Sequence, residues 1–506
     1  MSDDAHRLYE EVCRHARRTA LWSTIEEGLG WDQRTQMPAA AAEYRAEQVT
    51  LLAGMIHQHW TDAEFGRRLA ELAAGPLAAD PHSDTGANIR RLKRRYDRKA
   101  KLPAALVEEL ARTAVLAEAA WEEARRKNDF PTFRPLLERM IELKRQEADA
   151  LGYVQCRYDA LLDDYEPEAL TAEVTQVLAA LRGPLVELIR HIRDSNRRPD
   201  VAILHRRYPA AVQAEFGRQA ATQIGFDFRR GRLDVTVHPF CCGLGPNDCR
   251  ITTRYDEQFF NTAIFGILHE AGHGIYDQGL PGEHFGTPLG EAISLGIHES
   301  QSRMWENMVG RSLAFWESSY PLAQRTFPEA LGEVPLRTFY FAINDVRPSL
   351  VRVEADEATY NLHILVRFEL EQDLLDGKLA VADLPEAWRQ KYREYLGVRP
   401  ESDADGVLQD VHWSAGLIGY FPTYTLGNLY AAQFFAQADA DLGGLADQFA
   451  RGEFEPLRRW LREKIHRQGQ RFSASELVRQ VTGRPLDAQP LLDHLRGKFG
   501  PLYGLE

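Results

Sequence analysis

The sequence predicts a mainly α-helical fold, with one large helical body and a small β-sheet near its middle. Long segments rich in Ala, Leu, Glu and Arg carry apolar residues at three- to four-residue spacing, which is typical of amphipathic helices. Only short Pro/Gly/Asp clusters, such as 75–84 and 399–406, separate these segments. Because no long linker divides the chain, we expect residues 1–506 to form a single domain.

The elements can be assigned in chain order. Helices are expected at 107–128, 133–152, 170–194 and 365–378. Short β-favouring pieces surround an Arg-Gly turn within 226–240, and residues 250–258 supply a further strand, which predicts a small sheet. Two apolar segments, 264–279 and 288–306, follow this sheet and are expected to be helical.

Composition and charge narrow the class of protein. The chain is 44% hydrophobic and 27% charged, and its 61 Lys and Arg against 74 Asp and Glu give a net charge of −13. This balance disfavours nucleic acid and anionic membranes as partners. The N-terminal segment lacks the apolar core of a signal peptide, and no run of about 18 apolar residues predicts a membrane span. Five cysteines, an odd and sparse number, favour a reducing cytoplasm without disulfides.

Residues 264–279, IFGILHEAGHGIYDQG, place three ionisable side chains in an apolar run. On a helix, His269 and His273 project from one face about 40° apart, so both imidazoles can bind one zinc ion. Glu270 lies on the flank of that face, where it can act as a general base. Hydrogen-bonded core histidines are the alternative, but burying three such groups without a partner is costly. The pattern therefore indicates a metal site.

Two glycines interrupt the same helix. Gly272 and Gly274 each weaken a helix by roughly 1 kcal/mol relative to Ala. Close approach by another backbone would explain why both are present.

A catalytic zinc site needs a third protein ligand and an open position for water. No third histidine follows at the short HExxHxxGxxH spacing, so the candidates are Glu291, His298 and Glu299. His298 and Glu299 are adjacent and point about 100° apart, so we do not expect both to bind one ion. We choose Glu299, because its neighbours are apolar, and predict a His₂Glu site. A glutamate on a helix surface is the alternative.

Six short motifs occur in order along the chain. They are HPF at 238–240, DCRIT at 248–252, HEAGH at 269–273, HESQ at 298–301, VRVEAD at 351–356 and GVLQDVHW at 406–413. In this order and spacing they resemble the thermostable carboxypeptidase 1 (carboxypeptidase Taq type) family of HExxH zinc metallocarboxypeptidases. The length and the helical character fit the family over the whole chain. One departure is Val351, where the family pattern usually has Ile or Asn.

The resemblance implies a fold similar to neurolysin and angiotensin-converting enzyme, with a long deep substrate groove. It also implies a cytoplasmic homodimer that removes single amino acids from peptide C-termini with broad specificity. The metal ligands are then His269, His273 and Glu299 around one zinc ion, for which cobalt can substitute. Glu270 takes the role of the catalytic base.

A carboxypeptidase must recognise a free carboxylate, and the planar guanidinium of arginine does so with two parallel hydrogen bonds. The family resemblance points to Arg352 as this anchor. On a helix through this motif, Arg352, Asp356, His363 and Arg367 fall near one stripe. The alternative for Arg352 is an i,i+4 ion pair with Asp356 on a solvated face.

Three further residues are candidates for stabilising the oxyanion. His412 and Tyr420 resemble the histidine and tyrosine that follow the zinc helices in angiotensin-converting enzyme and neurolysin. Their spacing is not identical, so Tyr424 can take the phenol role instead. Core packing with a satisfied hydroxyl is the alternative for either tyrosine.

The family places the motifs of His238, Asp248 and Arg250 beside the groove, where they limit how far substrate extends. A structural ion pair between Asp248 and Arg250 is the alternative. A second zinc site is also conceivable, made of His238, Cys241, Cys242 and Cys249. Its cysteine spacing matches no standard zinc ribbon, and buried free thiols explain it more simply.

The predicted reaction is metal-assisted hydrolysis of the C-terminal peptide bond. Glu270 takes a proton from the activated water and delivers it to the leaving amine, and Arg352 holds the C-terminal carboxylate. A dipeptidyl carboxypeptidase or an oligoendopeptidase on the same scaffold are alternative enzymes. A peptide-binding protein without catalysis is the alternative outside enzymes, although such a protein has no need for Glu270.

Overall fold

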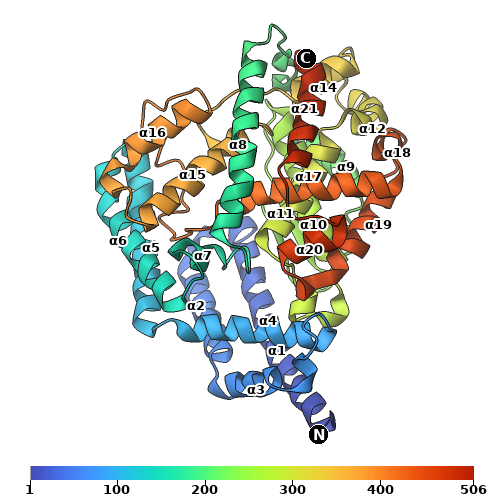
Figure 1. Ribbon diagram of the computed structural model, residues 1–506. Helices are drawn as coiled ribbons and strands as arrows, with labels where there is room; N and C mark the ends of the chain where they lie inside the picture. The colour runs from blue at the N-terminus through green and yellow to red at the C-terminus, as the bar shows by residue number, and fades with distance from the viewer. Residues whose placement is uncertain (1, 506) are drawn as a thin grey trace.

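The computed structural model describes residues 2–505 and shows a mainly helical protein (Figure 1), as predicted. It contains one three-stranded sheet, which was also predicted. Before the sheet the helices are α1 Ser2–Thr35, α2 Ala42–Trp60, α3 Ala63–Ala73, α4 Asp84–Lys101, α5 Ala104–Lys127, α6 Phe130–Leu151, α7 Arg157–Leu162, α8 Thr171–Asp194 and α9 Ala210–Ile224. The strands are β1 Gly231–Val235, β2 Cys241–Gly243 and β3 Cys249–Thr253. After the sheet come α10 Phe260–Gly279, α11 Leu295–Arg303, α12 Leu313–Thr326, α13 Pro328–Leu331, α14 Leu336–Ile343, α15 Tyr360–Leu375, α16 Leu384–Tyr395, α17 Pro422–Leu442, α18 Leu445–Ala450, α19 Glu455–Lys464, α20 Ala474–Thr482 and α21 Gln489–Tyr503.

The sheet has the strand order β1-β3-β2, with β1 parallel and β2 antiparallel to the central strand. It lies directly before α10 in the chain, and β3 packs against that helix. The predicted small sheet before the HEAGH helix is therefore confirmed. The β-favouring piece expected before the Arg-Gly turn is wrong, because residues 226–230 form no strand and β1 begins only at Gly231. The second apolar segment is helical over a shorter range than expected, because α11 begins only at Leu295, where Ser294 caps it by accepting the N–H of Ile297.

The single helix expected through the arginine motif is wrong. Arg352–Glu354 forms a separate 3₁₀ turn, and α15 starts only at Tyr360. The carboxylate of Asp356 explains the break, because it accepts the backbone N–H groups of Ala358 and Thr359 at 3.0 and 2.9 Å. A side chain that bonds the backbone two or three residues ahead favours a turn over a continuing helix.

Helix α10 is buried on almost all sides, between α9, β3 and α11. Its contact with α11 requires Gly272, since a Cβ there would lie 2.7 Å from the Gln301 carbonyl oxygen. The expected close backbone approach is thus confirmed at Gly272. At Gly274 it is wrong, because the neighbours are the side chains of Phe226 and Cys249. The other side of α11 packs against α17, which crosses the centre of the body (Figure 1).

Two hydrophobic clusters stabilise the fold. The larger one contains side chains from α5 to α21 and surrounds α10. The smaller one joins α1 to α4 at the N-terminal end of the molecule (Figure 1), and its buried members are Val12, Ala16, Trp60, Phe65, Leu69, Leu72, Ile89 and Leu92. Within residues 2–505, no helix combines the length and the apolar character that a bilayer span requires.

The α10–α11 contact predicts the effect of substituting Gly272. The Cβ of Gly272→Ala would clash with the backbone at Gln301, so we expect a lower Tm, with a destabilisation of about 1–3 kcal/mol. The matched control is Gly183→Ala in α8, where the added Cβ meets no atom within 4 Å and helix propensity predicts an equal or higher Tm. Thermal unfolding followed by circular dichroism measures both. A Gly272→Ala protein as stable as the control would contradict the packing described here.

Candidate metal centre

Three side chains converge where α10 crosses α11. The Nε2 atoms of His269 and His273 lie 3.6 and 3.3 Å from Oε2 of Glu299. The potential ligand atoms of all three residues lie within 4.8 Å of one another. The side chains retain 19%, 14% and 10% exposure respectively, so they are largely buried but still reachable from solvent.

The hydrogen bonds of both imidazoles show that a cation fits this site. Nδ1 of His273 faces the carbonyl oxygen of His298 at 3.1 Å, and Nδ1 of His269 faces Oε2 of Glu306 at 2.9 Å. A carbonyl and a carboxylate only accept, so each Nδ1 carries a hydrogen, and in the neutral ring Nε2 presents a lone pair. When both rings are neutral, two lone pairs point at a carboxylate oxygen with no donor between them. A divalent cation resolves this repulsion, and His₂Glu is a ligand set that catalytic zinc uses.

Alternatives for the third ligand are engaged elsewhere. Nε2 of His298 donates to Oδ1 of Asp277 at 3.0 Å. The backbone carbonyl of His298 accepts from Nδ1 of His273 and so supports that ligand. Glu291 pairs with Arg95 on α4. The geometry therefore brings Glu299, and neither other candidate, to the two histidines.

Glu270 lies on the same helix as the histidines and is 6% exposed. Burial raises the pKa of its carboxyl to about 7, with a further contribution from the charge of Glu299. Burial and the nearby His298 lower the pKa of His273 to about 4, which keeps this imidazole neutral and able to bind a cation. A carboxyl with a pKa near neutrality beside a metal site is suited to general base catalysis.

Two residues that no sequence pattern indicated, Arg303 and Glu306, hold the ligands in place. Arg303 donates to Oε1 of Glu299 at 2.7 Å and contacts Glu306 at 3.3 Å, so one guanidinium ties two carboxylates together. Glu306 stands in a π-helical segment, Met304–Gly310, that continues α11. Because a π-helix shifts the usual i→i+4 register, no periodic pattern would have pointed to Glu306.

A chain of contacts links the metal centre to Arg352. The guanidinium of Arg303 lies 4.5 Å from the ring centroid of Tyr360, and the Tyr360 hydroxyl accepts a hydrogen bond from Nη1 of Arg352 at 2.9 Å. Nε and Nη2 of Arg352 both bind Asp410 at 2.9 Å, and Arg367 binds the other oxygen of Asp410. Arg352 therefore pairs with Asp410 and not with Asp356, contrary to the i,i+4 alternative.

His412, Tyr420 and Tyr424 form one group next to Arg352. Nε2 of His412 lies 3.3 Å from the Tyr424 hydroxyl, and the rings of Tyr420 and Tyr424 are 5.4 Å apart. Burial raises the pKa of both phenols, and the charge of Glu299 adds to this, so both hydroxyls stay protonated at neutral pH. Burial also lowers the pKa of His412 to about 4, so its imidazole is neutral.

The remaining predicted site residues lie around the sheet. Asp248 and Arg250 form a bidentate ion pair, with two contacts of 3.0 Å, and Arg250 stacks over Trp31 of α1. This is the structural ion pair that the sequence left open. His238 is exposed. The contacts of Asp248 and Arg250 therefore join the sheet to α1 instead of completing the metal centre.

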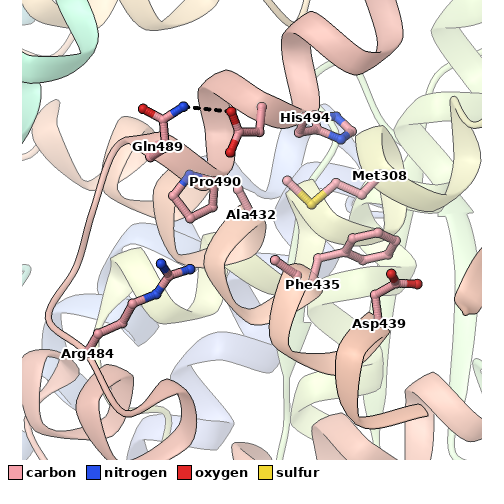
Figure 2. A pocket seen from close by; sticks show the side chains of 10 residues that line it. Met308, Ala432, Phe435, Asp439, Arg484, Gln489, Pro490 and His494 are labelled. Carbon is pink, nitrogen blue, oxygen red and sulfur yellow. Dashed lines mark hydrogen bonds between the residues drawn. The ribbon is translucent and has the colours of Figure 1, made fainter. Parts of the chain in front are cut away.

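A separate pocket lies between α17 and α21 (Figure 2). Its walls include Met308, Phe435, Asp439, Arg484 and His494. It shares none of its lining residues with the metal centre, so we do not assign the substrate to it.

A helical protein that buries two histidines of an HExxH helix and a glutamate around a possible cation site is typical of metallopeptidases. Comparison with known protein families agrees with this class. The family model described as carboxypeptidase Taq (M32) metallopeptidase matches residues 11–499, and the chain belongs to this family. The family resemblance read from the sequence is therefore confirmed.

The chain is similar to its relatives over almost its entire length. Thermostable carboxypeptidase 1 of Thermus thermophilus is 50% identical over 505 residues, covering 98% of this chain and 99% of the relative. Carboxypeptidase 1 of Bacillus subtilis is 38% identical over 502 residues, covering 99% of each chain. The crystal structure of M32 carboxypeptidase from Deinococcus radiodurans R1 superposes with a TM-score of 0.95 at 42% identity, covering 98% of this chain and 100% of that one.

The hydrogen bond between His269 and Glu306 predicts a role in metal affinity. Glu306→Gln removes the charge that orients His269 and enhances its basicity, so we expect a 10- to 100-fold weaker affinity for zinc. Competition with a chelator measures this, and Glu317→Gln on exposed α12 surface is the matched control. Equal zinc affinities for Glu306→Gln and the parent would show that Glu306 does not support the ligand.

Proposed function

We propose that the protein is a zinc-dependent carboxypeptidase that hydrolyses the C-terminal peptide bond and releases single amino acids. The observation that carries this proposal is the convergence of two imidazole lone pairs and the Glu299 carboxylate beside the buried Glu270. Membership of the M32 family and the carboxypeptidase names of its relatives support the choice of reaction. Cobalt can replace zinc, because this ligand set discriminates poorly between the two ions.

The roles of the residues follow from their chemistry. His269, His273 and Glu299 would hold the ion, which when bound acts as a Lewis acid that acidifies water and polarises the scissile carbonyl. Glu270 accepts the proton of the attacking water, because a carboxyl whose pKa is about 7 is partly ionised at neutral pH. The same carboxyl then delivers the proton to the leaving amine.

His412, Tyr420 and Tyr424 are the proposed donors to the oxygen that gains negative charge. A neutral imidazole and two protonated phenols all provide donors in a buried setting, where such hydrogen bonds are strong. The contact between Nε2 of His412 and the Tyr424 hydroxyl fixes the orientation of Tyr424, which favours it as the better placed phenol. Tyr420, the phenol to which the family resemblance points, lies beside both residues and is the second candidate.

Arg352 is the proposed anchor for the C-terminal carboxylate of the peptide. A guanidinium has five N–H groups, and three contacts to Asp410 and Tyr360 leave two for substrate. The contact with Asp410 fixes the orientation of the fork before substrate binds, which lowers the entropy lost on binding. His238, Asp248 and Arg250 are proposed to line the far end of the substrate groove.

We further propose that residues 1–506 act as one catalytic unit and that two chains form a homodimer. Exposed apolar side chains on α1 and α2 offer an interface: Leu21, Ile25, Tyr44 and Leu51 are 49%, 54%, 66% and 66% exposed. Sedimentation equilibrium measures the assembly, and the mass of a single chain would refute the dimer. All five cysteines are free thiols, which supports the cytoplasm as the compartment, and cell fractionation tests this.

The proposed reaction predicts a characteristic set of products. Mass spectrometry of a digested peptide should show a ladder that loses one residue at a time from the carboxyl end. Steps of two residues or internal fragments would instead indicate a dipeptidyl carboxypeptidase or an oligoendopeptidase. Glu270→Gln should bind zinc as the parent does but lower kcat by about 10²- to 10⁴-fold, because the base is lost. A variant as fast as the parent would rule out Glu270 as the base.

The proposed anchor predicts how strongly the enzyme prefers a free C-terminus. We expect the parent to hydrolyse a free-acid peptide far faster than its C-terminal amide, since the fork binds two carboxylate oxygens. Arg352→Lys keeps the charge next to Asp410 but loses the fork, so it should reduce this preference at least tenfold. The ratio of kcat/KM for the two peptides measures the effect independently of how much variant is folded. An unchanged ratio would show that another group binds the carboxylate.

A further inference from the structure

A second cluster of metal-binding side chains lies on the face of α10 that is turned toward the sheet. Sγ of Cys241 on β2 lies 3.6 Å from Sγ of Cys249 on β3 and 3.8 Å from Oδ2 of Asp277 on α10. The three potential ligand atoms all lie within 4.8 Å of one another. Together with the centre described above, these are the two such groups within residues 2–505.

The spacing of the two sulfurs fits a shared cation better than a disulfide. Two thiolates bound tetrahedrally at about 2.3 Å to one zinc ion are about 3.8 Å apart, close to the observed separation. A disulfide requires an S–S distance of about 2.0 Å. In the ladder Gly243 lies opposite Cys249, and Cys241 lies opposite Ile251, so the cysteines are diagonal neighbours.

Two glycines make room for this convergence. A Cβ at Gly243 would lie 3.1 Å from Oδ2 of Asp277, and a Cβ at Gly274 would lie 3.2 Å from Sγ of Cys249. Asp277 retains 19% exposure, so the cluster can be reached from solvent. The other oxygen of Asp277 accepts a hydrogen bond from His298, an arrangement that orients a ligating carboxylate.

We propose that Cys241, Cys249 and Asp277 form a second binding site, for a thiophilic divalent cation such as zinc, cobalt or cadmium. Two sulfurs and one oxygen select for soft or borderline cations over magnesium and calcium. Binding converts both thiols to thiolates and releases their two protons to solvent. The site differs from the four-residue set considered from the sequence, because His238 and Cys242 do not join it and Asp277 supplies the third ligand.

The site is separate from the catalytic metal centre but next to it. His298 donates to Asp277 through Nε2, accepts from His273 through its backbone carbonyl, and stacks on the His273 ring at 4.4 Å between centroids. A cation bound by the cysteines and Asp277 would therefore be linked to His273, a ligand of the catalytic metal, through the single residue His298. The ligand sets still differ in one respect that an experiment can use, since only the second site contains sulfur.

Cobalt titration of the full, reduced chain tests the proposal, because thiolate-to-cobalt charge transfer gives a near-ultraviolet band that His₂Glu ligation cannot produce. We expect the parent to bind two equivalents of cobalt, the second together with this band. Cys241→Ser and Cys249→Ser should each abolish the band and leave one equivalent. Cys242→Ser is the matched control, since it alters the intervening residue of β2 and should retain the band.

No band at saturating cobalt, or a band that persists when both Cys241 and Cys249 are serine, would overturn the proposal. If a serine variant fails to fold, alkylation of the parent replaces it as the test. Cobalt should then slow the alkylation of Cys241. The alkylation rate of Cys156, a half-buried cysteine outside the proposed site, should not change. Equal rates for Cys241 with and without cobalt would contradict the second site. Neither the cobalt band nor the alkylation rate depends on catalytic activity. A negative result in these experiments would therefore leave the proposed peptidase function unaffected.

Discussion

The structure depends on an electrostatic conflict among the metal ligands that a bound cation resolves. Nε2 lone pairs of His269 and His273 face the same oxygen of Glu299 at 3.6 and 3.3 Å, because acceptors on the far side fix the hydrogen of each imidazole at Nδ1. In a largely buried position this arrangement is unfavourable without a positive charge. The surrounding fold is therefore a scaffold that holds the three ligands in the geometry that a metal ion requires.

The scaffold achieves this by close packing of α10, α11 and α17. Gly272 lets the backbone of α11 approach α10, and Gly427 lets α17 approach Glu299, since a Cβ there would lie 2.6 Å from Cγ of the ligand. The buried carboxylate of Glu166 accepts the backbone N–H of Gly296 at the start of α11. Such a contact complements the positive N-terminal end of α11 and fixes where this helix, which carries Glu299, begins.

Polar contacts then extend the site from the metal ligands to the proposed substrate anchor. Arg303 joins Glu299 to Glu306 and stacks on Tyr360, whose hydroxyl binds Arg352. The metal centre and the anchor thus belong to one network of charged groups. In a low-dielectric interior such a network is rigid when every member is paired, which suits an enzyme that must hold the scissile bond at a constant distance from a C-terminal carboxylate.

The sequence predicts those features that depend on residues close together in the chain. Helical periodicity and the HEAGH spacing act within one or two turns, so the helical fold and the convergence of His269 and His273 were predictable. Asp277 was also within reach, because it follows Glu270 by seven residues and lies within about 20° of it on the helix. Glu306 was not, since it stands in a π-helical segment, and Arg352 was placed on the wrong element because Asp356 bonds the backbone and delays α15. Contacts such as Arg352 with Asp410 join segments 58 residues apart and leave no local pattern.

The most direct test is a crystal structure of the protein grown with zinc, with anomalous diffraction measured at the zinc absorption edge. We expect a strong anomalous peak bounded by Nε2 of His269, Nε2 of His273 and the carboxylate of Glu299. Absence of a peak there, with Glu299 turned away from the two imidazoles, would contradict it.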